Sequence, residues 1–246
     1  GFFTYTILVI LKQKKLSEIK TDFVNNMTHE FKTPISTIAL SSDVLMRDDI
    51  IKNPERLKHY ATIISEENKR LKSQVESVLQ VSQIDSHKIA LNVTDIDMHA
   101  LIENIAKNME PRVSELHGKI ILQLNAKKVI VSGDEVHLTN ILYNLLDNAI
   151  KYCDKIPEIQ IITLNKHKGI EISVKDNGKG IETSSQNMIF EKFFRVPSGN
   201  LHDVKGFGLG LFYVKNMIKL HRGKIALHSI PKVGTTFTIW FHTKEK

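Results

Sequence analysis

The stretch NLLDNAIKY, from Asn144 to Tyr152, does most to decide the fold of this 246-residue chain. Three other short stretches accompany it in a fixed order. MTHEFKTPI, from Met27 to Ile35, precedes it, while DNGKGI, from Asp176 to Ile181, and GFGLGL, from Gly206 to Leu211, follow it. Any one of the four is short enough to arise by chance, so the interpretation depends on their order and their separations.

NLLDNAIKY has the pattern of an amphipathic helix. Asn144, Asn148, Lys151 and Tyr152 are spaced by four, three and one residues, and apolar residues take the other side. One helical face therefore offers amide oxygens together with an ammonium group. An ordinary surface helix would explain each polar residue singly, but it leaves their joint occurrence unexplained.

The two glycine-rich stretches predict a site for a nucleotide. DNGKGI follows a predicted strand, so Asp176 can accept a hydrogen bond from an exocyclic amine while Gly178 and Gly180 let the chain turn closely. As a turn alone this composition is common. GFGLGL opens a predicted helix, where backbone N–H groups can face phosphate. It lacks the end of a P-loop and the glycine spacing of a dinucleotide fingerprint, so both of those sites are disfavoured.

The first half of the chain predicts two long helices. No glycine interrupts residues 16–45, and Asn53 before Pro54 marks the start of a second helix that runs to about Ile84. Each helix has an apolar stripe, and in a hairpin only one other helix is present to cover it, so neither stripe is fully buried. We therefore expect two chains to pair as a four-helix bundle. The alternative is a monomer whose C-terminal domain covers the stripe. The apolar stripe of the first helix comprises Ile19, Phe23, Met27, Phe31, Ile35 and Ile38.

After Ile89 short strands alternate with helices, which predicts a sheet with helices packed on one face. Residues 182–205 show little periodicity and predict a functional or mobile loop. The expected strands are 119–124, 129–131, 159–164, 170–174, 224–228 and 236–241, and the expected helices are 98–115, 134–152 and 209–221.

His29 lies opposite the apolar stripe at about 100° per residue, so we expect it to be exposed to solvent or to a partner. Thr33, four residues on, shares its face. A neutral imidazole keeps one ring nitrogen with a free lone pair and can attack a terminal phosphate. Glu30 is the nearest carboxylate in sequence, although its contact with His29 needs a favourable rotamer. Pro34 predicts a bend or weak point just after the histidine.

Taken together, the four stretches resemble the histidine, asparagine and glycine boxes of two-component sensor histidine kinases, from about Leu16 to the C-terminus. FEKFFRV, from Phe190 to Val196, resembles the phenylalanine box of that family, beside its lid over ATP. The resemblance implies an α+β chain: an antiparallel helical hairpin that dimerises into a four-helix bundle, followed by an α/β sandwich ATP-binding domain of the GHKL (Bergerat) type. The implied domains are 16–90 for dimerisation and phosphotransfer and 91–246 for catalysis, after a leading segment 1–15.

The same resemblance implies a cycle in which His29 is phosphorylated from ATP and passes the phosphoryl group to an aspartate on the receiver domain of a response regulator. Glu30 would orient the imidazole or act as general base, Thr33 would position water for phosphatase activity, and Arg195 would contact the phosphates or the histidine helix. Asn148 would hold Mg²⁺. The implied nucleotide-binding residues are Asn144, Asn148, Lys151, Tyr152, Asp176, Gly178, Gly180, Ile181, Lys205, Gly206, Gly208, Leu209, Gly210 and Thr235.

KVGTTFTI resembles the last glycine box of the family, but Lys232 stands where relatives often have a glycine. One rival is an ATPase of the same superfamily, such as gyrase B or the ninety-kilodalton heat-shock chaperone, without histidine phosphorylation. Those proteins use a glutamate inside the asparagine box, where this chain has Asp147, and they lack the histidine helix. A docking scaffold without catalysis would be expected to lose the boxes.

The N-terminal run GFFTYTILVIL, followed by Lys12, Lys14 and Lys15, is expected to be the cytoplasmic end of a membrane-spanning helix, since it supplies about half of the roughly 20 residues that a span needs. A short buried leader is the alternative. We therefore expect an inner-membrane protein lying largely on the cytoplasmic side. The net charge is +7, but the sequence has no stripe of arginine and lysine interleaved with aromatic residues, which nucleic-acid binding would favour. We therefore expect no nucleic-acid partner. Cys153 has no cysteine to pair with in the chain.

Overall fold

The computed structural model describes residues 1–85, 89–196 and 207–244 and divides into two compact units. One unit contains the described residues up to 85 together with the short segment 207–209. The other contains the remaining described residues. We describe each unit by itself.

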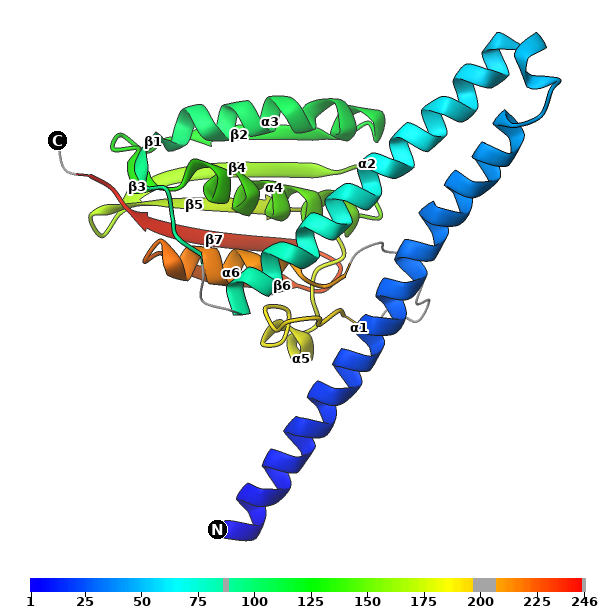
Figure 1. Ribbon diagram of the computed structural model, residues 1–246. Coiled ribbons are helices and arrows are strands. Elements are labelled where there is room, and N and C mark those ends of the chain that lie inside the picture. Colours follow the sequence, from blue (N-terminus) through cyan, green and yellow to red (C-terminus); the bar gives the residue numbers. More distant parts are fainter. Residues whose placement is uncertain (86–88, 197–206, 245–246) are drawn as a thin grey trace. The chain divides into compact units, whose positions relative to one another are not determined.

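The helical unit is a hairpin of two long helices. Helix α1 (Phe2–Leu45) and helix α2 (Pro54–Asp85) are joined by a connection that contains the single 3₁₀ turn η1 (Ile50–Lys52). Asn53 caps α2, because its Oδ1 accepts from the backbone N–H of Arg56 at 3.1 Å. Helix α1 runs unbroken through Pro34 and begins well before the expected residue 16, so its first turns extend beyond the end of α2 (Figure 1).

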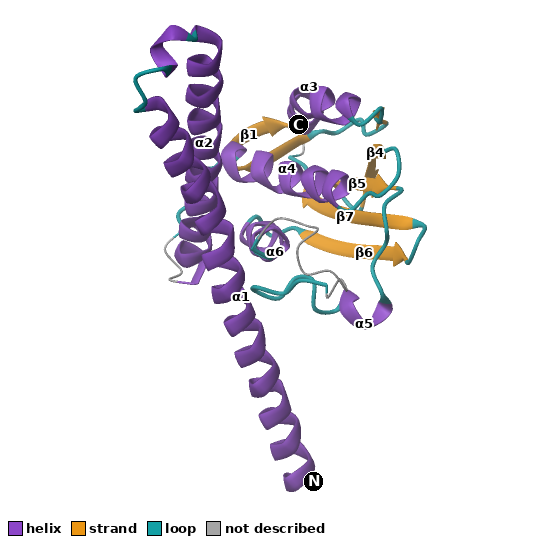
Figure 2. Ribbon diagram, turned by 90° about the vertical axis from the view of Figure 1, so that its right-hand side faces the viewer, coloured by secondary structure: helices purple, strands orange, loops and turns teal. Residues whose placement is uncertain are grey.

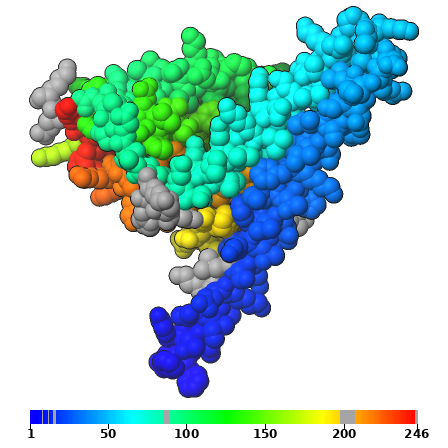
Figure 3. Space-filling view, viewed as in Figure 1, coloured from blue at the N-terminus to red at the C-terminus, as the bar shows by residue number. Residues whose placement is uncertain are grey.

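Few side chains of the hairpin are fully buried. Among the side chains of the two helices and their connection that the structure describes, the buried apolar ones are Ile50 and Val81, apart from Pro34. Most of the predicted α1 stripe is half-buried, and Ile35 remains 55% exposed. Each helix therefore covers only one side of its neighbour, as expected for half of a bundle. The first turns of α1, dark blue in Figure 3, carry exposed aromatic and aliphatic side chains.

Among the residues that the structure describes, no helix is both long enough and apolar enough to cross a membrane.

The second unit is a five-stranded sheet with helices, in the strand order β2-β4-β5-β7-β6. Strands β2 and β4 are parallel, and the other neighbours are antiparallel. Strands β1 and β3 form a separate antiparallel pair. The elements are β1 (Thr94–Asp97), α3 (Met98–Glu115), β2 (Lys119–Leu124), β3 (Ile130–Gly133), α4 (Glu135–Lys151), β4 (Glu158–Lys166), β5 (Gly169–Asp176), α5 (Thr183–Gln186), α6 (Gly210–Leu220), β6 (Lys224–Ile230) and β7 (Gly234–His242).

The core lies between one face of this sheet and the helices α3, α4 and α6, which Figure 2 shows on the same side of the strands. Alternate residues of the central strands point into it, as the period of a half-buried strand requires. The α+β class and the order of a helical region before an α/β domain are confirmed. The innermost strand residues are Ile159, Ile161, Ile170, Ile172, Val174, Phe237, Ile239 and Phe241.

The helix boundaries follow from local capping. Asp97 accepts from the backbone N–H groups of His99 and Ala100, and Asp134 accepts from that of His137, so α3 and α4 begin where the sequence predicts. The short strand β1 was not expected, because its sequence, Thr-Asp-Ile-Asp, has one apolar residue and two acidic ones. Pairing with β3 stabilises it, which the local sequence does not reveal.

Candidate functional site

The histidine of the first helix is exposed on α1, as expected. Among the described residues its ring has no hydrogen-bond partner, so no protein group blocks the unprotonated ring nitrogen. Thr33, on the same face, donates its hydroxyl to the backbone carbonyl of His29 at 3.2 Å. Glu30 turns away instead, and its Oε2 accepts from Arg70 and Gln74 of α2 at 3.4 Å each. Because residues of α2 bind the Glu30 carboxylate, Glu30 does not orient the imidazole of His29 in this arrangement.

Helix α4 carries the asparagine box of the second unit. Asn148 is half-buried, and within the described residues its side-chain amide has no protein partner. Asp147 is held between two cations, because its carboxylate forms ion pairs with Arg112 of α3 at 2.6 Å and with Lys151 one turn further along α4. Lys151, which was expected to bind the nucleotide, therefore forms an ion pair with Asp147. Arg112 was not expected at this position, because it lies far from the motif in the chain.

Asn144 joins α4 to the start of α6. Its Nδ2 donates to the carbonyl of Asn140 at 2.7 Å, which fixes the amide. A Cβ at Gly210 would lie 2.6 Å from Asn144 Oδ1, so the first turn of α6 packs closely against the Asn144 side chain. The glycine stretch and the asparagine box thus meet at the N-terminal end of a helix, where backbone N–H groups favour an anion.

Asp176, at the end of β5, is the central acidic group of the second unit. Its Oδ1 accepts from the backbone N–H groups of Gly178 at 2.8 Å and Thr235 at 3.1 Å. Burial raises the pKa of Asp176, although these two N–H groups oppose the rise. One carboxylate oxygen is thereby fixed by the backbone, which leaves the other oxygen for a hydrogen-bond donor such as the amine of adenine.

The DNGKGI turn crosses the connection between β6 and β7. A Cβ at Gly180, whose φ is +68°, would lie 2.1 Å from the carbonyl oxygen of Ile230, and a Cβ at Gly234 would lie equally close to that of Asp176. Gly178 in turn lies against the carbonyl of Tyr152 at the end of α4. The ends of β5, α4 and the β6–β7 connection therefore meet at the positions where the sequence places glycine.

Ser229 was not anticipated, yet it links two predicted site residues, Ile181 and Thr235, with Gly234. Its Oγ accepts from the backbone N–H of Ile181 at 2.9 Å, donates to the carbonyl of Gly234 at 3.1 Å and lies 2.9 Å from the hydroxyl of Thr235. Gln186 reinforces the same crossing by donating to the carbonyls of Ile181 and Ser229. A serine in an alternating strand has no signal in the sequence that marks it.

Tyr152 and Arg195 bring the phenylalanine box toward the end of α4. Desolvation raises the pKa of Tyr152, although the residue remains 43% exposed, and the positive charge of Arg195 acts in the opposite direction. Gly208 takes a left-handed conformation with φ of +69°, and Leu209 is buried. The predicted site residues Lys205 and Gly206 lie outside the described residues.

The donor set suits a magnesium ion that is bound mainly by its substrate. In the described part of the chain there is no cluster of three or more histidine, cysteine or acidic side chains that could hold a metal by itself. The amide oxygen of Asn148 is available, and Mg²⁺ commonly uses one or two protein oxygens together with phosphates and water. Asn148 therefore fits the single protein ligand that the sequence predicts.

Two family descriptions match the chain, one in the helical unit and one in the unit that contains the sheet. Residues 19–87 match the His Kinase A (phospho-acceptor) domain, and residues 133–245 match the histidine kinase-, DNA gyrase B- and HSP90-like ATPase. The first match contains His29, and the second contains the asparagine and glycine stretches.

Curated relatives are sensor proteins. The chain is 45% identical over 241 residues to the sensor protein RprX of Bacteroides fragilis (strain YCH46), covering 96% of this chain and 46% of the relative. It is 29% identical over 234 residues to the sensor protein SrrB of Staphylococcus aureus (strain NCTC 8325 / PS 47), covering 95% of this chain and 40% of the relative. The chain thus spans less than half the length of these relatives.

Solved structures share the fold. Full-length ShkA in complex with AMPPNP matches with a TM-score of 0.68 at 23% identity, covering 94% of this chain and 47% of that one. The histidine kinase AdeS of Acinetobacter baumannii matches with a TM-score of 0.64 at 22% identity, covering 88% and 98%. With both domain types in the expected order and close sensor relatives, the chain belongs to the two-component sensor histidine kinases.

Proposed function

We propose that the chain is an ATP-dependent protein-histidine kinase that phosphorylates its own His29. The observation that carries the proposal is the pairing of two features: an exposed imidazole on α1 with no partner among the described residues, and a half-buried, backbone-anchored carboxylate at Asp176 in an ATPase-type unit. Solvent exposure gives the nucleophile access, and the fixed carboxylate gives adenine a specific acceptor.

In the proposed reaction a ring nitrogen of His29 forms a bond to the terminal phosphorus as the bond from that phosphorus to the bridging oxygen of ADP breaks. The electron pair of the broken bond leaves with ADP, and the proton on the other ring nitrogen passes to Glu30 or to water. Bound Mg²⁺ would neutralise charge on the phosphates. The protein itself contributes positioning: Asn148 holds the ion, and the α6 N-terminus faces the phosphates.

The phosphoryl group would then move to an aspartate of a response regulator receiver domain. A related fold supports this partner, since the structure of the histidine kinase ThkA was solved in complex with the response regulator protein TrrA, at 22% identity and a TM-score of 0.63, covering 98% of this chain and 66% of ThkA. Thr33, on the same face as His29, is proposed to position water for phosphatase activity toward that regulator. Attachment to the inner membrane through the apolar N-terminal run stays a prediction.

The rival ATPase function needs a carboxylate in the asparagine box to activate water. Asp147 is the residue at that position, and Arg112 and Lys151 both neutralise it. A carboxylate that already accepts from two cations is a poor general base, because protonating it would break two ion pairs. The geometry therefore favours transfer to the histidine over hydrolysis.

The test is incubation of the chain with ATP labelled on its terminal phosphate and Mg²⁺. We expect label that is acid-labile and base-stable in the wild type and absent from His29→Ala and Asn148→Ala. His59→Ala is the matched control, because His59 is exposed on the neighbouring helix α2 and should retain full labelling. Label that persists in His29→Ala would refute the nucleophile.

A further inference from the structure

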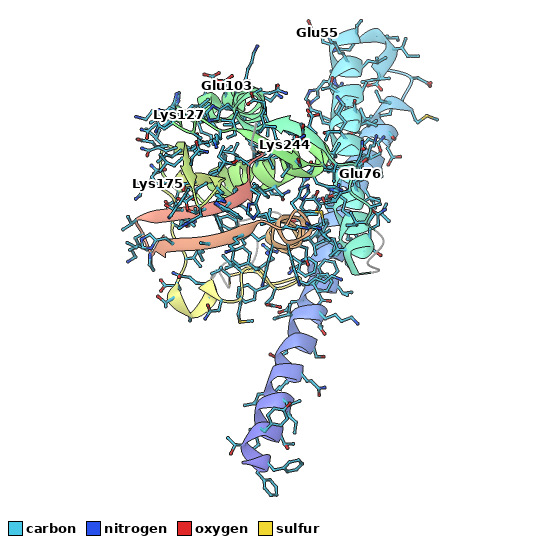
Figure 4. All side chains as sticks on the ribbon, turned by 90° about the vertical axis from the view of Figure 1, so that its left-hand side faces the viewer. Glu55, Glu76, Glu103, Lys127, Lys175 and Lys244 are labelled. Carbon is cyan, nitrogen blue, oxygen red and sulfur yellow. The ribbon has the colours of Figure 1, made fainter. Side chains whose placement is uncertain are left out.

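Four polar side chains meet between the two long helices beside His29. Glu30 comes from α1, while Glu67, Arg70 and Gln74 come from α2, where spacings of three and four residues place them on one face. We call these four residues the clamp. Its α2 residues lie just before Glu76, which Figure 4 labels on that helix.

The charges in the clamp are unequal, because two carboxylates share one guanidinium. Arg70 lies 3.4 Å from Glu30 Oε2 and 3.7 Å from Glu67 Oε2. Both distances exceed the roughly 2.7–2.9 Å of a well-formed charge-assisted hydrogen bond. Arg70 therefore lies between two competing partners and satisfies neither fully.

Two acceptors of the clamp are also left without a donor. In the part of the chain that the structure describes, Glu67 Oε2 and Gln74 Oε1 are shielded from solvent and have no hydrogen bond. A buried acceptor without a donor destabilises the arrangement that contains it. A small movement of Arg70 toward Glu67 would satisfy that carboxylate and take the cation away from Glu30, whose remaining donor, Gln74, is neutral and 3.4 Å away. The clamp therefore has a second arrangement, in which Arg70 binds Glu67, that differs from the first by a small movement of one side chain.

The position of Glu30 matters because adjacent helical residues point about 100° apart. The side chain of Glu30 is 17% exposed and faces α2, whereas His29 faces outward. We propose that Arg70 switches between Glu30 and Glu67, and that phosphorylation of His29 requires the Glu67-bound arrangement, in which Glu30 is released to orient the imidazole. The proposal rests on the histidine kinase activity proposed above. It makes Arg70 and Glu67 positioning residues.

Variants at the two ends of the switch should have opposite effects. Arg70→Gln releases Glu30 and should raise the single-turnover rate of His29 phosphorylation by about fivefold, the effect expected for a partly exposed ion pair. Glu67→Gln removes the competing partner of Arg70 and should lower the rate by about the same factor. The KM for ATP should stay unchanged in both, because the nucleotide contacts lie in the other unit.

Lys69→Gln is the matched control, since Lys69 is exposed next to Arg70 and its replacement removes the same charge. The double variant Arg70→Gln/Glu30→Gln should fall to the rate of Glu30→Gln alone, because the gain acts through Glu30. A gain that survives Glu30→Gln, or a rate for Arg70→Gln at or below that of the wild type, overturns the switch. Absence of label from wild-type His29 would instead refute the kinase proposal itself.

Discussion

At the scale of single residues, Asp176 shows how the candidate nucleotide site conflicts with stability. Its carboxylate is half-buried at the end of β5, and two backbone N–H groups only partly compensate for the lost water. Specific recognition of adenine needs this ionised acceptor in a partly desolvated place. The folded chain therefore bears a cost at neutral pH that a neutral side chain would not impose.

Asp176→Asn should stabilise the chain at pH 7 while it weakens ATP binding. Burial raises the pKa of Asp176 above its ordinary value of 3.8, so the cost is present above the raised value and disappears as the pH falls toward 3.8. Asparagine keeps an Oδ1 for Gly178 and Thr235, but its amide N–H would face the adenine amine. Thermal unfolding should show a gain that shrinks on acidification, and calorimetry should show an ATP Kd raised at least about tenfold.

Asp95→Asn is the control for this change. Asp95 is exposed and pairs with Lys244 and Ser132, which lower its pKa, so its replacement should bring no gain in stability at pH 7. ATP affinity should be unaffected. If Asp176→Asn instead lowers the unfolding temperature at pH 7, or leaves the ATP Kd unchanged, the role assigned to Asp176 is wrong.

At the scale of elements, the crossing of the DNGKGI turn and the β6–β7 connection holds the site together. The backbone N–H of Lys232 donates to the carbonyl of Lys179 at 2.6 Å, and that of Lys179 donates to the carbonyl of Tyr152 at 2.9 Å. Lys232 has a φ of +64°, in the left-handed region that glycine adopts without strain. A lysine at this position therefore adds backbone strain to the connection between β6 and β7.

Gly180→Ala should destabilise the second unit by at least about 2 kcal/mol, because the left-handed conformation costs about 1–2 kcal/mol in an L-residue and the methyl group also overlaps a carbonyl. The overlap is between the added Cβ and the carbonyl oxygen of Ile230, which would lie 2.1 Å apart. Urea unfolding measures the loss. Lys232→Gly is the matched change in the opposite sense, and it should leave stability unchanged or raise it by up to about 1 kcal/mol. Equal losses in both variants would contradict the argument.

At the scale of the whole molecule, the hairpin leaves too much apolar surface exposed to be complete by itself. Val24 is 49% exposed and Leu79 is 56% exposed, and the buried apolar side chains of the two helices are few. Apolar stripes on two antiparallel helices are covered when a second hairpin packs against them. We therefore propose that two chains associate through this unit.

Sedimentation equilibrium at micromolar concentration should give twice the chain mass of 28.0 kDa for the wild type. The double variant Val24→Glu/Leu79→Glu should raise the dissociation constant at least about a hundredfold, since burying each apolar side chain contributes about 1.5–3 kcal/mol. Val136→Glu, which alters an exposed valine on α4 in the other unit, should leave the mass unchanged. A monomeric wild type would favour the alternative in which the stripe is covered within one chain.

The sequence by itself determined the parts that depend on local chemistry. Helical periodicity predicted both long helices, and Asn53 before Pro54 predicted where the second begins, because a cap acts within one turn. Gly178 and Gly180 were predicted to let the chain turn closely, and a Cβ at either would meet a backbone carbonyl. The exposure of His29 followed from its angle to the apolar stripe.

Only the tertiary structure decided which side chains face one another across elements. Glu30 pairs with Arg70, forty residues away, and Asp147 pairs with Arg112 of another helix, although the sequence suggested His29 as the partner of Glu30 and phosphate as that of Lys151. Ser229 and the strand β1 likewise depend on neighbours that are distant in the chain. Spacing within one helix or strand fixes the direction of a side chain, but its partner is set by the packing of separate elements, which no local pattern encodes.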